Sequence, residues 1–185
     1  MELYTDIYYI QRIQSGDTAS FACLLDRYSR PVHSLIYRIV ANQEDAEELV
    51  QDVFLKAFRN LSGFKGNSSF ATWIYRIAYN TAISATRKKK REFLTIEDGQ
   101  LDQVTEDDLT GLYGFNGEED LLGELEAALD LLSPEERGLI LLFYMDNKSV
   151  EEIAGITQLS SANVKTKLHR IRKKLYLLMI KIKGE

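Results

Sequence analysis

Hydrophobic residues recur at three- and four-residue steps along most of the chain, and no strictly alternating run bounded by turn residues stands out. This spacing is typical of amphipathic helices that pack on a common core. Of the two prolines, Pro31 is expected to kink or interrupt a helix. The pattern predicts an all-α protein. We expect helices over residues 4–14, 17–41, 43–61, 69–90, 119–131, 134–146, 149–156 and 161–182.

Charge divides the chain into three parts. The net charge is −5, but residues 92–136 hold over half of the acidic residues and no Lys or Arg. Basic residues gather on either side, in the run 87–91 and in the last helix. This segregation predicts two small helical domains joined by a flexible acidic linker. We place an N-terminal helical bundle at 1–91, the linker at 92–118 and a C-terminal helix-turn-helix domain at 119–185.

The last quarter of the chain has the pattern of a helix-turn-helix. Ser149 and Glu152 have capping-box spacing, and Ser160 is suited to cap the next helix. A basic amphipathic helix is more often a solvated face than a recognition surface, but here the positive charge is concentrated on the second helix, which favours DNA contact. We expect its cations on the outer faces: Lys165, Lys167, Arg170, Arg172, Lys173 and Lys174.

The N-terminal part carries two further candidate surfaces. The helix that Asn42 caps has more apolar surface than one face can bury. Two interpretations of the additional apolar residues remain: they form a surface that binds a partner, or they form a thick apolar stripe inside the bundle. The polar loop 64–70 precedes a helix with aromatic and basic residues, a combination suited to single-stranded nucleic acid. In that helix we expect Trp73, Ile74, Ile77 and Ala78 in the core, and Tyr75, Arg76, Tyr79 and Asn80 exposed.

Four motifs then occur in one order along the chain: DAEELVQDVF at 45–54, FATWIYRIAYN at 70–80, LSPEER at 132–137 and VKTKLHR at 164–170. With these motifs the chain resembles the extracytoplasmic-function class of the bacterial sigma-70 transcription initiation factors over nearly its whole length. The motifs look like the segments of that family that bind core polymerase, bind the minus-10 element, begin region 4 and recognise the minus-35 element. The linker is too short to hold the middle domain of larger members.

The resemblance implies a role for each surface. The clamp helices of core RNA polymerase would bind Glu48, Gln51, Asp52, Phe54 and Leu55. The minus-10 element would contact Phe64, Lys65, Asn67, Ser69, Arg76, Tyr79 and Asn80. The minus-35 element would contact Ser161, Ala162, Asn163, Lys165, Thr166, Lys167, Arg170, Arg172 and Lys173. It also implies a polymerase flap contact, a linker that enters the polymerase channels, and an anti-sigma factor as a further partner.

Two features depart from the family pattern. Family members usually carry Gly at the helix-turn-helix corner, whereas this chain has Gln158 there, so we expect either a left-handed backbone at Gln158 or a different turn. The tail at 177–180 is unusually apolar for an exposed helix end and is expected to pack on its own domain or on a partner.

Two other functions compete with this interpretation. A stand-alone DNA-binding regulator would use the helix-turn-helix without polymerase. An enzyme is disfavoured because the two histidines, His33 and His169, are far apart and no phosphate-binding glycine motif or spaced metal ligands occur. We therefore expect no catalytic residue, metal or cofactor. Cys23 is the one cysteine, and its apolar neighbours place it in the expected core. We recognise no signal peptide or membrane helix in the sequence. The chain is therefore expected in the cytoplasm.

Overall fold

The computed structural model describes residues 4–88, 96, 98–111 and 119–184, and within them it is helical without strands. The N-terminal bundle consists of α1 (Asp6–Gln14), α2 (Phe21–Val40), α3 (Gln43–Asn60) and α4 (Phe70–Lys88), with short 3-10 turns at Thr18–Ser20 and Leu61–Gly63. The C-terminal bundle consists of α7 (Glu119–Asp130), α8 (Pro134–Tyr144), α9 (Val150–Thr157) and α10 (Ser161–Lys183). The all-α prediction is confirmed, with helix ends close to those expected.

The helices begin where their capping residues predict. The side chain of Asn42 accepts a hydrogen bond from the backbone N–H of Asp45 at the start of α3. Ser133 and Glu136 form a complete capping box at the start of α8, with Pro134 in the first turn. Pro31 does not interrupt α2, which runs unbroken from Phe21 to Val40.

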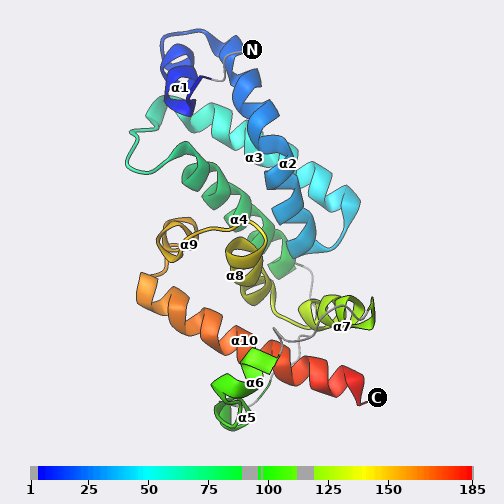
Figure 1. Cartoon of the computed structure of the whole chain (residues 1–185). Helices are drawn as coiled ribbons and strands as arrows, with labels where there is room; N and C mark the ends of the chain where they lie inside the picture. The colour runs from blue at the N-terminus through cyan, green and yellow to red at the C-terminus, as the bar shows by residue number, and fades with distance from the viewer. Residues whose placement is uncertain (1–3, 89–95, 97, 112–118, 185) are drawn as a thin grey trace.

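The two bundles share one hydrophobic core. α2 and α4 of the N-terminal bundle pack against α8 and α9 of the C-terminal bundle, and Figure 1 shows α8 and α9 between α4 and α10. One continuous cluster of buried side chains extends from α1 to α10. Side chains of both bundles in this cluster are almost fully inaccessible, including Leu35, Ile36, Ile74, Leu142, Ile153 and Ile156. The structure is therefore closed, with the two bundles in direct contact.

Part of the acidic linker is also helical. α5 (Asp98–Asp102) and α6 (Glu106–Gly111) pack on α10 and bury Leu101, Val104 and Leu109. On α10, Leu178 and Met179 of the apolar tail are buried, so the tail packs within its own chain as one of our alternatives expected, although Ile180 remains exposed. Residues 89–95 and 112–118, and with them most of the basic run 87–91, lie outside the described residues.

Two smaller expectations concern the N-terminal bundle and the membrane. Cys23 is only partly buried, because it lies beside Tyr9 at the edge of a hollow near α1 rather than inside the core. Among the described residues, no helix combines the length and the hydrophobicity that a bilayer crossing requires.

Candidate nucleic-acid interface

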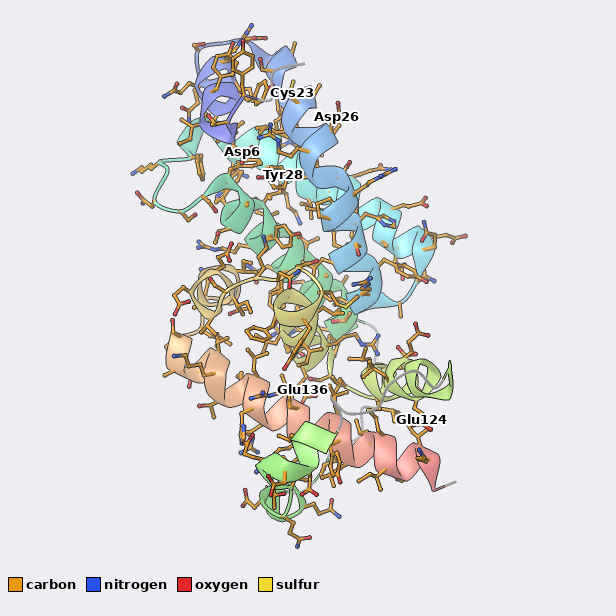
Figure 2. The ribbon with its side chains drawn as sticks, viewed as in Figure 1. Asp6, Cys23, Asp26, Tyr28, Glu124 and Glu136 are labelled. Atoms are coloured by element: carbon orange, nitrogen blue, oxygen red, sulfur yellow. The ribbon has the colours of Figure 1, made fainter. Side chains whose placement is uncertain are left out.

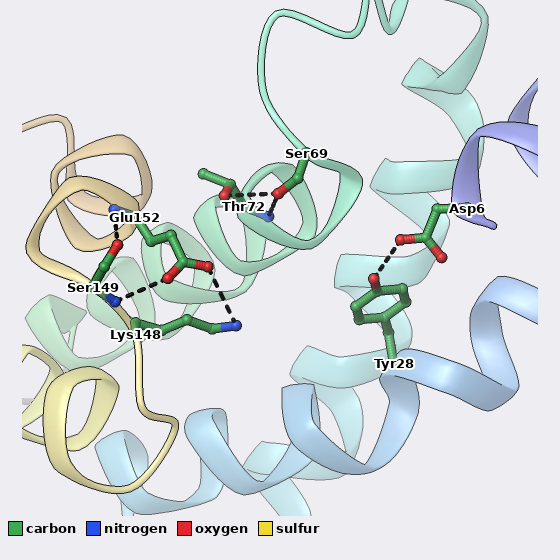
Figure 3. Close-up of polar contacts among 7 residues, drawn as sticks. All are labelled: Asp6, Tyr28, Ser69, Thr72, Lys148, Ser149 and Glu152. Carbon is green, nitrogen blue, oxygen red and sulfur yellow. Dashed lines mark hydrogen bonds and ion pairs between the residues drawn. The ribbon is translucent and has the colours of Figure 1, made fainter.

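α9 and α10 form a helix-turn-helix whose two helices both have defined starts. Ser149 and Glu152 form a reciprocal capping box, in which the Ser149 N–H donates to the Glu152 carboxylate at 2.9 Å and the Glu152 N–H donates to the Ser149 hydroxyl at 3.1 Å (Figure 3). Ser160 accepts from the N–H of Asn163 at 3.2 Å. Between the helices Gln158 has φ of 61°, so of the two alternatives for this corner the left-handed backbone is the one found.

The first half of α10 presents most of the predicted minus-35 residues to solvent. The buried side chains Val164, Leu168 and Ile171 anchor one face of the helix. The residues on the outer face are exposed: Ala162, Asn163, Lys165, Thr166, Lys167 and Arg170. The remaining predicted residues, Ser161, Arg172 and Lys173, are half-buried at the flanks of this face. The structure thus brings the minus-35 candidates together on one helix surface.

Lys174 does not belong to this outer face, contrary to expectation. Its side chain is only 10% exposed, and its Nζ lies 2.9 Å from a carboxylate oxygen of Glu136 in α8. Figure 2 shows Glu136 where α8 approaches α10. Lys174 follows Ile171 by three residues and precedes Leu178 by four, so it falls on the apolar stripe of the helix. Its charge is balanced inside the domain and is not directed at DNA.

The predicted minus-10 loop combines an aromatic cluster with exposed polar residues. The rings of Phe64, Phe70 and Trp73 lie within contact distance, with centroids 5.2 to 6.1 Å apart. Lys65 and Asn67 are exposed on the loop. A hollow of about 470 Å³ next to the loop is lined by Lys56, Asn60, Gly63, Phe64, Trp73 and Ile77. Rings beside an open hollow are suited to stacking with an unpaired base.

Ser69 has a structural role in this loop. Its hydroxyl accepts a hydrogen bond from the backbone N–H of Thr72 at 3.1 Å and lies 2.9 Å from the Thr72 hydroxyl (Figure 3). Such a contact caps the start of a helix, here α4. Ser69 is still exposed, so its capping role does not remove it from the surface.

Two predicted minus-10 residues on α4, Arg76 and Tyr79, are covered in this structure. Tyr79 is 7% exposed and its neighbour Tyr75 is 4% exposed, against our expectation that both face solvent. Arg76 is half-buried and donates from Nε to the carbonyl of Gly155 in α9 at 2.8 Å. The reason is tertiary, because α8 and α9 pack on this face of α4. Asn80 is exposed, as predicted.

On the same helix, the residues expected in the core divide into two groups. Ile74 and Ala78 are buried, whereas Trp73 and Ile77 are only half-buried beside the hollow. Burial raises the pKa of the Tyr75 hydroxyl, and the nearby acidic Asp146 adds to the effect. The buried Tyr75 ring lies under the ammonium of Lys148, 4.6 Å from the ring centroid, and so contacts the segment between α8 and α9.

Helix α3 presents a polar row together with exposed apolar side chains. Glu48, Gln51 and Asp52 are exposed, and Leu55 is 47% exposed beside them. Phe54 is the exception among the predicted polymerase contacts, because it is 5% exposed and packs edge-on against Phe21 of α2. The thick apolar stripe of α3 thus serves partly as core, through Phe54, and partly as surface, through Leu55.

Family models and curated relatives identify the class of protein. The model for sigma-70 region 2 matches residues 24–92, and the model for sigma-70 region 4 matches residues 122–175. The ECF RNA polymerase sigma factor SigW of Bacillus subtilis (strain 168) is 32% identical over 172 residues, which cover 90% of this chain and 92% of SigW. The chain belongs to the ECF sigma factors. The ECF RNA polymerase sigma-E factor of Escherichia coli (strain K12) is also 32% identical, over 92% of both chains.

Solved structures of low sequence identity share the fold of this sigma factor. CnrH, solved in complex with the cytosolic domain of CnrY, superposes with a TM-score of 0.69 at 22% identity over 95% of this chain and 97% of CnrH. The sigma factor RpoE of Bartonella quintana, solved with the anti-sigma factor NepR, gives a TM-score of 0.63 at 23% identity over 86% and 96%. Sigma factors are transcription initiation factors, so family membership excludes the enzyme hypothesis.

Proposed function

We propose that this sigma factor directs core RNA polymerase to promoters through three of its surfaces. The observation that carries the proposal is the helix-turn-helix corner at Gln158, beyond which the exposed first half of α10 presents small polar and basic side chains. A helix of this kind enters the major groove with its N-terminal residues. Asn163 is suited to a base edge, and Lys165 and Arg170 are suited to bases or phosphates of the minus-35 element.

The surface for core polymerase is the exposed row of α3. Glu48, Gln51 and Asp52 supply charge and hydrogen-bond acceptors, and Leu55 supplies an apolar centre. A polar row around one exposed apolar residue resembles the rim and centre of a protein interface. We assign this row to the polymerase clamp helices, and the C-terminal domain to the flap.

The surface for the minus-10 element is the loop before α4 and the hollow beside it. Lys65 and Asn67 are exposed there, and the rings of Phe64 and Trp73 border the hollow. Enzymes and factors that take a base out of the stack hold it with aromatic rings and hydrogen bonds to its edge. Binding of the extruded non-template strand at this loop is the means by which the factor promotes melting.

Run-off transcription tests the proposal. Fragmented host DNA is transcribed by core polymerase with and without the protein, and discrete transcripts are expected only when both are present. The double variant K165A/R170A should lose promoter-specific transcripts but keep binding to core polymerase. Lys181→Ala, which removes an exposed lysine from the far end of α10, is the matched control and should transcribe like the wild type. Duplex binding by the protein alone, without transcripts, would instead support a stand-alone regulator.

We also propose regulation by an anti-sigma factor and a cytoplasmic location beside the polymerase. Support comes from the family and from RpoE of Bartonella quintana, a protein of the same fold that was solved with the anti-sigma factor NepR. The test is affinity purification of the tagged protein from its host. A co-purified protein that stops run-off transcription when added back is expected, and its absence under all growth conditions would contradict this part of the proposal.

A further inference from the structure

Helix α6 belongs to the acidic linker, but it has a defined start and a fixed place on α10. The Thr105 N–H donates to the Asp108 carboxylate at 2.8 Å, and the Asp108 N–H donates to the Thr105 hydroxyl at 3.2 Å, so the two residues cap the helix reciprocally. Val104 and Leu109, on either side of this turn, are each 4% exposed. Figure 1 shows α5 and α6 along α10, on the side away from α8 and α9. The capped turn and its two buried anchors hold α6 against α10.

Two carboxylates of α6 contact one face of α10. An oxygen of Glu106 lies 3.4 Å from Nδ1 of His169, and the Tyr176 hydroxyl donates to the carboxylate of Asp108 at 3.4 Å. His169 and Tyr176 are seven residues apart, so they lie on the same face of the helix, two turns from each other. Asp107 stands between the two acids in the sequence, and the first turn of α6 thus carries three carboxyl groups. A compact negative charge therefore borders the middle of α10.

The face between these two contacts belongs to the proposed minus-35 surface. Arg172 and Lys173 follow His169 by three and four residues, so they share its face of α10, and both are half-buried. The Nε of Arg172 is buried and has no hydrogen-bond partner within the described part of the chain. A guanidinium donor is costly to leave unpaired, and a phosphate oxygen satisfies it. The acids of α6 therefore border the two cations that we assign to DNA phosphates.

We propose that α6 is an intramolecular ligand of the minus-35 helix, whose carboxylates compete with DNA phosphates for the face of α10 at His169, Arg172 and Lys173. The inference rests on the proposed function, in which Arg172 and Lys173 bind phosphates. A carboxylate and a phosphate attract the same cations, and a phosphate close to α6 would meet charge of its own sign. DNA can therefore occupy this face only after α6 has left it.

The contact between α6 and α10 is suited to a reversible competitor. The Glu106 side chain is 71% exposed, so its interaction with His169 is weak. Helix α6 has six residues, too few for a stable helix in isolation, so it unfolds when it leaves α10. In the proposed function the linker enters the polymerase channels, and a linker held there cannot also lie on α10. Binding of core polymerase would thus expose this face of α10 to the minus-35 DNA.

Binding of the full chain to duplex DNA, without polymerase, tests the competition. The probe is a labelled duplex with the minus-35 element of a promoter identified by run-off transcription, titrated at about 0.1 M salt. Glu106→Gln with Asp108→Asn removes the two carboxylates that contact α10, and we expect at least about fivefold tighter binding. Asp102→Asn with Glu126→Gln is the matched control, because it removes the same charge from two exposed acids that form no ion pair within the described residues. The control should bind within about twofold of the wild type.

A buried anchor of the linker gives a second test, in which bulk charge acts in the opposite direction. Val104→Asp places a carboxylate at a position that is 4% exposed and should detach α5 and α6 from α10. The added negative charge by itself weakens DNA binding, whereas release of α6 strengthens it, and we expect at least about fivefold tighter binding. Amide exchange should become faster in residues 98–111 and stay unchanged in α8 and α9, which shows that the C-terminal bundle is intact.

The outcomes separate the inference from the proposed function. Equal or weaker DNA binding by either variant that keeps its fold, or an equal gain in the control, would overturn the inference, while transcripts with core polymerase still support a sigma factor. Lys165→Ala and Arg170→Ala, added to Val104→Asp, should abolish the gained affinity; if the gain persists, the DNA is bound elsewhere and the inference is wrong. Absence of duplex binding by every protein, together with absence of transcripts, would overturn the proposed function itself.

Discussion

The ion pair between Lys174 and Glu136 leads to a quantitative prediction about stability. Nζ of Lys174 lies 3.2 and 2.9 Å from the two carboxylate oxygens of Glu136. The Lys174 side chain is 10% exposed, against 30% for Glu136. Glu136 also accepts a hydrogen bond from the backbone N–H of Ser133 at 2.9 Å. The pair links the first turn of α8 to the middle of α10. If either partner is removed, water can hydrate the remaining Glu136 carboxylate more easily than the remaining Lys174 ammonium.

Glu136→Gln should be the more damaging of the two single substitutions. It leaves the Lys174 ammonium nearly buried without a counter-ion, a loss that costs about 3–5 kcal/mol in a fully buried pair and about 2–3 kcal/mol here, where the carboxylate is partly hydrated. Lys174→Met should cost only about 1 kcal/mol, because the remaining carboxylate is accessible to water and keeps its Ser133 hydrogen bond. The double variant should be no less stable than Lys174→Met, which corresponds to a coupling energy of at least about 2–3 kcal/mol.

Equilibrium unfolding in urea, followed by circular dichroism, measures all four proteins. The reasoning is refuted if Glu136→Gln changes the free energy of unfolding by less than about 0.5 kcal/mol, the usual range for a surface substitution. It is also refuted if the double variant loses the sum of the two single effects, since the two side chains would then be energetically independent.

The pH dependence of the same variants gives an independent check. Burial raises the pKa of Glu136, but the hydrogen bonds from Lys174 and Ser133 outweigh it and hold the pKa below its ordinary value of 4.5. A carboxyl whose pKa is lowered on folding stabilises the protein above the unfolded pKa and loses this effect as the pH falls through the folded pKa. The stability difference between wild type and Glu136→Gln should therefore be full at neutral pH and shrink below pH 4.5. A difference independent of pH would contradict this.

Three further predictions concern single features of the structure. Gln158→Gly should stabilise the protein by about 1 kcal/mol in urea unfolding, because the left-handed backbone strains every residue with a Cβ. Ser149→Ala should cost about 1 kcal/mol through loss of its cap, seen as faster amide exchange in α9. Glu48→Lys combined with Asp52→Lys should abolish co-elution with core polymerase and leave the unfolding temperature unchanged, because both side chains are exposed; retained co-elution would contradict the α3 assignment.

Helix limits were predictable from sequence because the interactions that start or end a helix lie within a few residues. The spacing of Ser133, Pro134 and Glu136 predicted the start of α8, and the structure forms that capping box in full. The left-handed corner at Gln158 is a different case, because it was one of two alternatives and followed from the Gly that family members usually carry at this position. Local chemistry decides where the helices start, and this chemistry can be read from the sequence.

The orientation of α4 was not predictable in the same way. Its apolar and aromatic residues cover more than one face, and periodicity cannot tell which face the N-terminal bundle buries and which meets another domain. Trp73 was expected in the core and Tyr79 at the surface, whereas the structure leaves Trp73 half-buried and Tyr79 7% exposed. The partners that bury Tyr79 lie on α8, more than fifty residues away along the chain, and no local pattern encodes them.

Helices α5 and α6 show why a composition-based linker assignment misses short ordered segments. They have five and six residues, well below the length at which an isolated helix is stable in water, so their own propensity could not predict them. They pack on α10, where Leu101 and Val104 are buried and the hollow between them and α10 is lined by Tyr176, Leu177 and Leu178. The apolar stretch of α10 that looked too hydrophobic for an exposed helix end is therefore the surface on which these acidic segments become helical.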